Sequence, residues 1–296
     1  MNRHMIWLTV FTVCRKLLQI IIFLFRNHFG KPIRKSTAVN GIKTFSKTSR
    51  KTIEDFYNGA NRTMNTIKHK QKNISILGDS ISTLFGYSKP SEGVFYTAER
   101  RYETGVYYLS DTWWGQVTNA VGGRLLVNDS FAGSTVCFDM HNEIASYACG
   151  DNRTSALGDR EEVPDVIMIF MGMNDRGVGV RLRPSCEAED NDPTFFSEAY
   201  SAMLCKLKAN YPQSDIWCLT LPLGSLDGYA QSDAARRKTE EYSKVIAECA
   251  ARNGCRLIDI CRMEPYESID GLHPTAVGMK QIAEAVLSEL RREGEL

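Results

Sequence analysis

The sequence predicts a doubly wound α/β domain, in which helices cover both faces of a parallel sheet. From Asn73 onward, short apolar runs alternate with longer amphipathic stretches, which is typical of successive βαβ units. The run at 166–171 is apolar at consecutive positions, as expected for a central strand covered on both faces. These observations favour one three-layer α/β/α domain with a parallel sheet of about five strands.

Each predicted strand is a short apolar run that ends near a residue disfavoured in strand interiors. Gly78 ends the first run, Pro164 precedes the third and Pro222 closes the fourth, and such residues commonly bound strands. The predicted strands are residues 74–77, 125–127, 166–171, 216–221 and 256–260.

The helices are predicted from apolar residues at helical spacing and from capping residues. Ser232 or Asp233 is the expected N-cap of the third helix. Pro274 suits the first position of the last helix, where its missing N–H costs nothing. The predicted helices are residues 114–121, 195–210, 232–252 and 274–292.

Charge is distributed unevenly along the chain. Residues 1–63 hold twelve Lys and Arg but only two acidic residues, whereas the remainder holds 24 basic and 33 acidic residues. The mildly acidic body provides no basic field for nucleic acid. The sequence contains neither a phosphate-binding G-x-x-x-x-G-K-[ST] loop nor a dense His/Cys cluster, so nothing indicates a nucleotide or a metal.

Residues 1–63 are expected to form a basic N-terminal extension, with the folded domain spanning 64–296. Two apolar runs within residues 5–25 flank Arg15 and Lys16, and neither alone reaches the roughly 20 residues that span a bilayer. Two interpretations stay open. Residues 5–25 form an imperfect membrane anchor or uncleaved signal segment, or Met64 is the true start and the protein is cytoplasmic. Membrane contact is expected only in the first case.

Nine cysteines are present, and none forms a C-x-x-C pair. Several lie inside apolar runs, where cysteine behaves as a small hydrophobic residue. This pattern favours a reducing compartment, although a disulfide between distant cysteines stays open.

Polar residues follow the predicted strands at the edge where doubly wound sheets bind ligands. Ser80 lies just past the first strand, at an expected helix start, where its hydroxyl is expected to be exposed and its N–H unpaired. Asp270 and His273 lie on the segment after the fifth strand. A hydroxyl nucleophile, an imidazole base and an orienting carboxylate are the groups that ester hydrolysis by a serine enzyme requires.

Ester hydrolysis also requires donors for the oxyanion that forms during the reaction. Gly133 follows the second strand, and a glycine allows the backbone N–H to approach a substrate closely. Asn174 follows the third strand and carries a side-chain amide. Together with the N–H of Ser80, these groups are the predicted oxyanion hole.

Four short motifs carry a family resemblance. Gly78-Asp-Ser80, Asn128 to Gly133, Gly172-Met-Asn174-Asp175 and Asp270-Gly-Leu-His273 resemble, in order, the four blocks of SGNH (GDSL-type) hydrolases. The resemblance covers about Ile74 to Leu290 and makes residues 64–296 the expected catalytic domain. It implies a flavodoxin-like fold, no metal or organic cofactor, and ester hydrolysis with Ser80, Gly133 and Asn174 as oxyanion donors.

Several neighbouring residues have structural interpretations beside functional ones. Asp79 and Asp175 are expected to fix turns by accepting backbone N–H bonds. The aromatic residues between Phe95 and Trp114 either line the substrate site or pack in the core, and the Trp113–Trp114 pair fits both. Arg176 could meet an anionic group of a substrate, but it is expected to be solvated instead.

The predicted activity is cofactor-free hydrolysis of an acyl ester by Ser80, His273 and Asp270 through an acyl-enzyme. The substrate is expected to be a small-molecule or carbohydrate ester with a short acyl group, such as an O-acetylated sugar. A lysophospholipase or a thioesterase is the alternative within the enzymes. The alternative without catalytic activity is a binder of acylated sugars or a surface interaction module, because fold does not fix function.

Overall fold

The computed structural model describes residues 71–88, 93–138, 146–183, 192–224, 232–294 and 296. The chain divides into the units Met1–His69 and Lys70–Leu296, and every described residue belongs to the second. The predictions for residues 1–63, including the anchor at 5–25 and the start at Met64, therefore lie outside the described residues. Within the described ranges, no helix is both long and apolar enough to cross a membrane.

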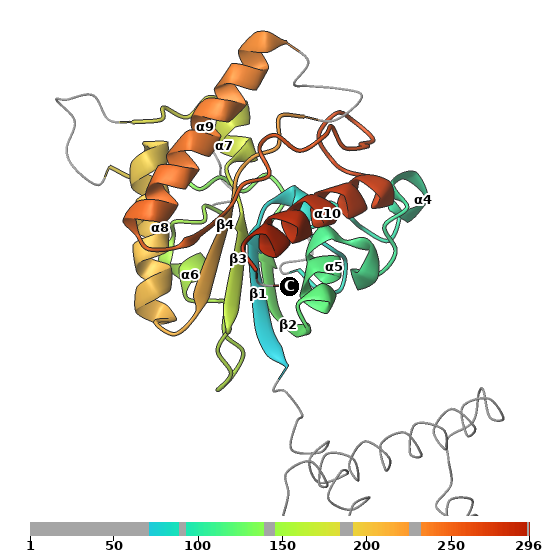
Figure 1. The fold of residues 1–296 in the computed structure, drawn as a ribbon, viewed down its shortest axis with the longest axis horizontal. Helices are drawn as coiled ribbons and strands as arrows, with labels where there is room; N and C mark the ends of the chain where they lie inside the picture. The colour runs from blue at the N-terminus through green and yellow to red at the C-terminus, as the bar shows by residue number, and fades with distance from the viewer. Residues whose placement is uncertain (1–70, 89–92, 139–145, 184–191, 225–231, 295) are drawn as a thin grey trace, which may run out of the picture. The chain divides into compact units, whose positions relative to one another are not determined.

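A five-stranded parallel sheet forms the centre of the fold, in the order β2-β1-β3-β4-β5 (Figure 1). The strands are β1 (Lys72–Gly78), β2 (Gly123–Ser130), β3 (Val166–Phe170), β4 (Asp215–Leu219) and β5 (Arg256–Ile258). All five predicted strands are present, so the predicted α/β fold class is confirmed. β1 and β2 extend beyond the predicted runs because their polar end residues still pair with neighbouring strands.

Helices cover both faces of the sheet (Figure 1). On one face, α5 (Trp113–Ala120) packs against α10 (Ala276–Arg292); on the other, α8 (Phe196–Asn210) packs against α9 (Asp233–Arg252). The short elements η1 (Ser80–Ser82), α4 (Arg101–Thr104), η3 (Leu109–Asp111), α6 (Asp151–Thr154) and α7 (Met173–Val178) lie in the connections. A helix start was expected at Ser80, where η1 begins. The other four were not predicted, because so few residues leave no helical period to detect.

The strand β3 lies within the core, and all five of its residues are buried. Trp113 and Trp114 are fully buried. The Trp113 ring packs edge-on against Phe170, and its Nε1 donates to Ser82 Oγ at 3.2 Å. Of the two interpretations of the tryptophan pair, packing in the core is therefore the correct one.

The helix starts follow the capping chemistry of the sequence, with one correction. Ser232 caps α9 by accepting the N–H of Ala235. The last helix begins at Ala276, not at Pro274, because the Thr275 side chain is its N-cap. Pro274 instead forms an antiparallel bridge with Ser268.

The strand order reverses between β1 and β3. From β1 the chain moves to β2 on one side, and the remaining strands build outward on the other side. Such a switch point leaves a crevice at the carboxyl ends of the two central strands. Ser80 follows β1 and Asn174 follows β3, so both candidate site residues lie at this crevice.

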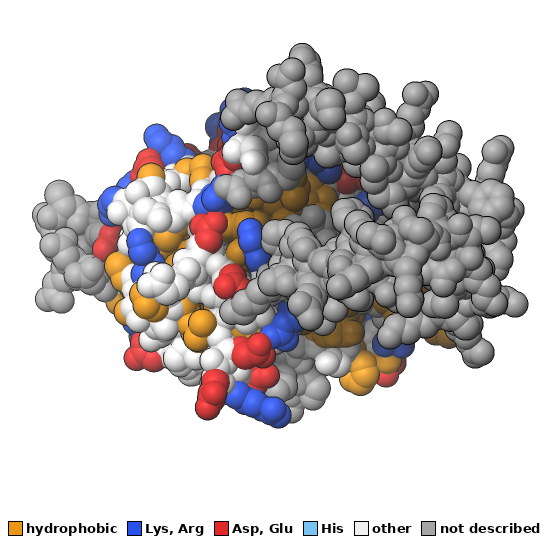
Figure 2. Space-filling view, turned by 60° about the horizontal axis from the view of Figure 1, so that its bottom comes forward, with side chains coloured by type: hydrophobic (Ala, Val, Ile, Leu, Met, Phe, Trp, Pro, Cys, Tyr) orange, Lys and Arg blue, Asp and Glu red, His pale blue; other side chains and the backbone are white. Residues whose placement is uncertain are grey.

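The described surface carries mixed charge on the face seen in Figure 2. Lys and Arg side chains lie among Asp and Glu side chains over that part of the molecule. Mixed charge of this kind creates little long-range attraction for a polyanion.

Candidate active site

Ser80 begins the 3₁₀ turn η1, directly after β1. Asp79 caps this turn: its Oδ1 accepts the N–H of Ile81 at 3.0 Å, which confirms the turn-fixing role expected from the sequence. Ser80 is only 5% exposed, so the expectation of an exposed hydroxyl was wrong. The reason is that the imidazole of His273 contacts the hydroxyl.

Three side chains from distant parts of the chain form a continuous hydrogen-bonded relay. His273 Nε2 lies 2.9 Å from Ser80 Oγ, and His273 Nδ1 lies 2.6 Å from Asp270 Oδ2. Asp270 Oδ1 also accepts the N–H groups of Leu272 and His273 at 3.0 and 2.7 Å. One carboxylate thus fixes both the backbone and the ring of His273. A neutral imidazole with its proton on Nδ1 presents Nε2 to the hydroxyl as a base.

The pKa shifts of His273 and Asp270 fit a neutral imidazole base and a charged carboxylate. Burial lowers the pKa of His273, and the nearby Arg100 lowers it further, against the opposing effect of Asp270. Burial raises the pKa of Asp270, but the hydrogen bonds and charge from His273 outweigh it and leave that pKa below its usual value. At neutral pH, Asp270 is therefore charged and His273 is neutral.

The predicted oxyanion donors follow the ends of strands: Ser80 follows β1, Gly133 follows β2 and Asn174 follows β3. Gly133 has a φ of +78°, a conformation that favours glycine. Among the described residues, no acceptor binds the backbone N–H of Ser80 or of Gly133. Asn174 Nδ2 donates to the carbonyl of Ser134 at 2.8 Å, which leaves the second N–H of this amide as a donor.

The loop that carries Gly133 is held by Asn174 and Asp175, which follow β3. Asp175, which is fully buried, accepts the N–H groups of Val136 and Cys137 at 2.9 and 3.0 Å. Asn174 and Asp175 therefore hold neighbouring parts of the loop that follows Gly133 by hydrogen bonds. The structural interpretation of Asp175 is correct.

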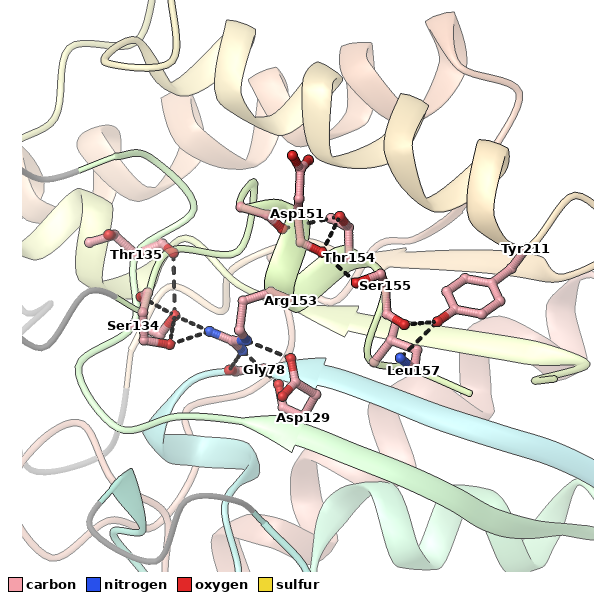
Figure 3. A network of polar contacts seen from close by, with 12 residues as sticks. Gly78, Asp129, Ser134, Thr135, Asp151, Arg153, Thr154, Ser155, Leu157 and Tyr211 are labelled. Atoms are coloured by element: carbon pink, nitrogen blue, oxygen red, sulfur yellow. Dashed lines mark hydrogen bonds and ion pairs between the residues drawn. The ribbon is translucent and has the colours of Figure 1, made fainter. Parts of the chain in front are cut away.

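A buried arginine on α6 joins this loop to the sheet (Figure 3). Arg153 is 5% exposed and donates to the carbonyls of Gly78 and Asp129, to the Asp129 carboxylate and to Ser134 Oγ. It also donates to Ser146 Oγ. Because Gly78 ends β1 and Ser134 adjoins Gly133, Arg153 fixes the loop relative to the strand that carries the nucleophile.

Asp79 gives the site a measurable pH dependence of stability. Burial raises its pKa from 3.8 to about 7, so the folded state keeps a proton that the unfolded state has lost. The stability that Asp79 contributes is therefore complete below about pH 4 and is lost as pH rises towards 7. Asp79→Asn keeps an acceptor for Ile81 and removes the ionisation. We expect the free energy of unfolding of the variant, measured in urea, to rise relative to that of the wild type between pH 4 and 7. A difference between the two proteins that does not change with pH would contradict this.

Within the described part of the chain, a pocket of about 260 Å³ borders the loop between Asp270 and His273, but none of Ser80, Asp270 and His273 lines it. It runs from α7 to the loop between Asp270 and His273, and it is lined by Met173, Asn174, Arg176, Gly177, Pro222, Leu223, Gly224, Tyr266, Gly271 and Leu272. Arg176 is only 6% exposed, so the expectation that it is solvated was wrong. Most of the lining side chains are apolar, and the pocket is smaller than those that hold drug-sized ligands.

Two residues that support this site carry no recognisable signal in the sequence. Arg153 has no motif, because its partners Gly78 and Asp129 are distant in the chain. Phe95, which stacks on His273 with ring centroids 3.5 Å apart, was only one of many aromatic residues in its segment. Within the described residues, no group of three His, Cys, Asp or Glu side chains is arranged to hold a metal ion, and all seven described cysteines are free thiols.

Comparison with known proteins identifies the class. The family model for GDSL-like lipases/acylhydrolases matches residues 72–290. The chain therefore belongs to the GDSL-like lipase/acylhydrolase family, as its four motifs predicted. No curated protein sequence matches it.

Solved structures with the same fold include two from Bacteroides species. A GDSL-like lipase from Bacteroides ovatus is 28% identical, with a TM-score of 0.59 over 76% of this chain and 100% of that one. A second, from Bacteroides uniformis, is 26% identical, with a TM-score of 0.58 over 76% and 97%. A carbohydrate acetylesterase from Sinorhizobium meliloti, 14% identical, shares the fold with a TM-score of 0.52 over 75% and 100%.

Proposed function

We propose that this protein is a serine esterase that hydrolyses short acyl esters, with Ser80, His273 and Asp270 as its catalytic triad. The observation that carries the proposal is the relay of 2.9 and 2.6 Å hydrogen bonds from the Ser80 hydroxyl through His273 to Asp270. A structural N-cap serine needs no imidazole at its hydroxyl, and a protein that only binds sugars needs no charged carboxylate behind that imidazole.

The geometry supports a two-step reaction. His273 Nε2 takes the Ser80 proton as Oγ attacks the ester carbonyl, and the same nitrogen then protonates the departing alcohol. Asp270 stabilises the imidazolium that forms between these steps. Water, activated by His273, attacks the acyl-enzyme and releases the acid. The N–H groups of Ser80 and Gly133 and the Asn174 amide are the proposed donors to the oxyanion, each contributing about 3 kcal/mol.

The size and lining of the pocket beside the loop between Asp270 and His273 support a short acyl group. A volume of about 260 Å³ with mainly apolar walls accommodates an acetyl or propionyl group more readily than a long lipid chain. The relative from Sinorhizobium meliloti is described as a carbohydrate acetylesterase. An O-acetylated sugar is therefore the proposed substrate class.

A panel of esters tests the proposal. We expect kcat/KM for p-nitrophenyl esters to be highest for acetate and to fall steadily through butyrate and octanoate. We also expect acetate to be released from acetylated xylan or acetylated glucose. A maximum at octanoate or longer would favour the lysophospholipase alternative, and activity on acyl-thiol substrates alone would favour the thioesterase. No turnover of any ester above the uncatalysed rate would remove the esterase proposal.

A further inference from the structure

The ring of Phe95 lies face to face against the imidazole of His273, an alignment that simple filling of space in the core does not require. Its ring is stacked on His273 at 3.5 Å between centroids and 10° between planes. A face-to-face contact this close covers one side of the imidazole and removes water from it. It also limits rotation of the ring out of the plane in which Nδ1 meets Asp270 and Nε2 meets Ser80.

The backbone of Phe95 is tied to the turn that carries the nucleophile. The N–H of Phe95 donates to Thr83 Oγ1 at 2.9 Å, and that hydroxyl donates to the carbonyl of Ser80 at 2.8 Å. Two hydrogen bonds therefore fix the stacking residue relative to Ser80.

The next residue is tied to the loop that carries the base. The hydroxyl of Tyr96, which is 1% exposed, donates to the carbonyl of Pro274 at 2.8 Å. The Tyr96 ring also meets Phe95 edge-on at 5.1 Å. Residues 95 and 96 thus connect the Ser80 turn to the His273 loop, although these lie nearly two hundred residues apart in the chain.

The outer face of Phe95 is covered by a cation. The Arg100 guanidinium carbon lies 4.2 Å from the Phe95 ring centroid, within the range of a cation–π interaction. Arg100, Phe95 and His273 therefore form a three-layer stack, with the guanidinium on the solvent side.

Resting on the esterase proposed above, we propose that Phe95 is a positioning residue that holds His273 between Ser80 and Asp270, and that Arg100 supports Phe95 from outside. The stack keeps the imidazole aligned through both proton transfers. It also keeps the imidazole neutral, because burial of the ring and the positive charge of Arg100 both disfavour protonation.

The pH test depends on the groups around His273. Burial and Arg100 lower its pKa, whereas Asp270 raises it. Burial raises the pKa values of Asp79, Tyr96 and Tyr266 on the surrounding segments. The same segments also carry the charged residues Glu99, Arg101 and Glu267. Both phenols are neutral near pH 7. Removal of Arg100 should therefore raise the pKa of His273 and shift the acid limb of the pH–rate profile to higher pH.

The experiment compares Phe95→Leu, Phe95→Tyr, Arg100→Gln and Arg101→Gln, assayed with p-nitrophenyl acetate from pH 4.5 to 9. Leucine keeps apolar bulk without a flat ring, tyrosine keeps the ring, and Arg101 is the adjacent arginine outside the stack. We expect Phe95→Leu to lower kcat by roughly 10- to 100-fold with little change in KM, as small misplacements of catalytic groups do. Phe95→Tyr should retain most of kcat. Phe95→Leu and Arg100→Gln should shift the acid limb upward, and Arg101→Gln should not.

Two results would overturn the proposal. If Phe95→Leu keeps the wild-type kcat and acid limb, the stack does not position the base. If it raises KM alone, Phe95 contacts substrate instead. Thermal unfolding of each variant separates these results from loss of folding. Failure of the wild type to hydrolyse any ester would instead remove the esterase proposal itself.

Discussion

Replacement of Ser80 by alanine should lower kcat for p-nitrophenyl acetate on the order of a million-fold, the size of loss seen when a serine hydrolase loses its nucleophile. Without Oγ no acyl-enzyme can form. The residual rate should reflect only binding and the oxyanion donors. The fold should persist, because the Ser80 hydroxyl contacts His273 while the turn is held by Asp79.

Ser82 provides a matched control in the same 3₁₀ turn. Its hydroxyl accepts Trp113 Nε1 and does not belong to the relay. We expect Ser82→Ala to lose about 1–2 kcal/mol of stability, since it leaves a buried donor unpaired, while kcat stays within a few-fold of wild type. Equal rates for the wild type and Ser80→Ala would disprove the assignment of the nucleophile.

Replacement of Arg153 by methionine should be the most destabilising of the substitutions considered, at about 3–5 kcal/mol in urea unfolding. Methionine fills similar space but leaves the half-buried Asp129 carboxylate and the carbonyl of Gly78 without their donor. Burial already raises the pKa of Asp129, against the effect of Arg153. Loss of the guanidinium should raise that pKa further, so the destabilisation should grow as pH rises and Asp129 ionises.

Arg124 gives the contrasting case. It pairs with Glu162 on the surface, where the side chains are 41% and 52% exposed. Such pairs contribute about 0–1 kcal/mol, so Arg124→Met should change stability little. A similar loss for both arginine variants would contradict the role assigned to Arg153.

The sheet and the candidate triad could be predicted because their signals are local. β3 reads as a buried strand from five consecutive apolar residues, and Asp270 lies only three positions before His273. The chemistry of a hydroxyl, an imidazole and a carboxylate at strand ends then suggests their meeting. The position of Ser232 as an N-cap followed from the same kind of local rule.

The supporting residues could not be predicted because their contacts are long-range. Nothing near Arg153 indicates that its guanidinium reaches Gly78, 75 positions earlier. Phe95 and Trp113 are both aromatic residues of one segment, yet one stacks on an imidazole and the other packs against Phe170. Only the folded arrangement separates these two roles.

The parallel sheet has a practical consequence for handling the enzyme. The strand β1 begins at Lys72, at the amino ends of the parallel strands, and Ser80 follows its carboxyl end. The seven residues of the strand span about 23 Å. A covalent attachment made at Gln71 is therefore separated from the Ser80 hydroxyl by the length of the strand. Immobilising the domain through that position should leave substrate entry unobstructed.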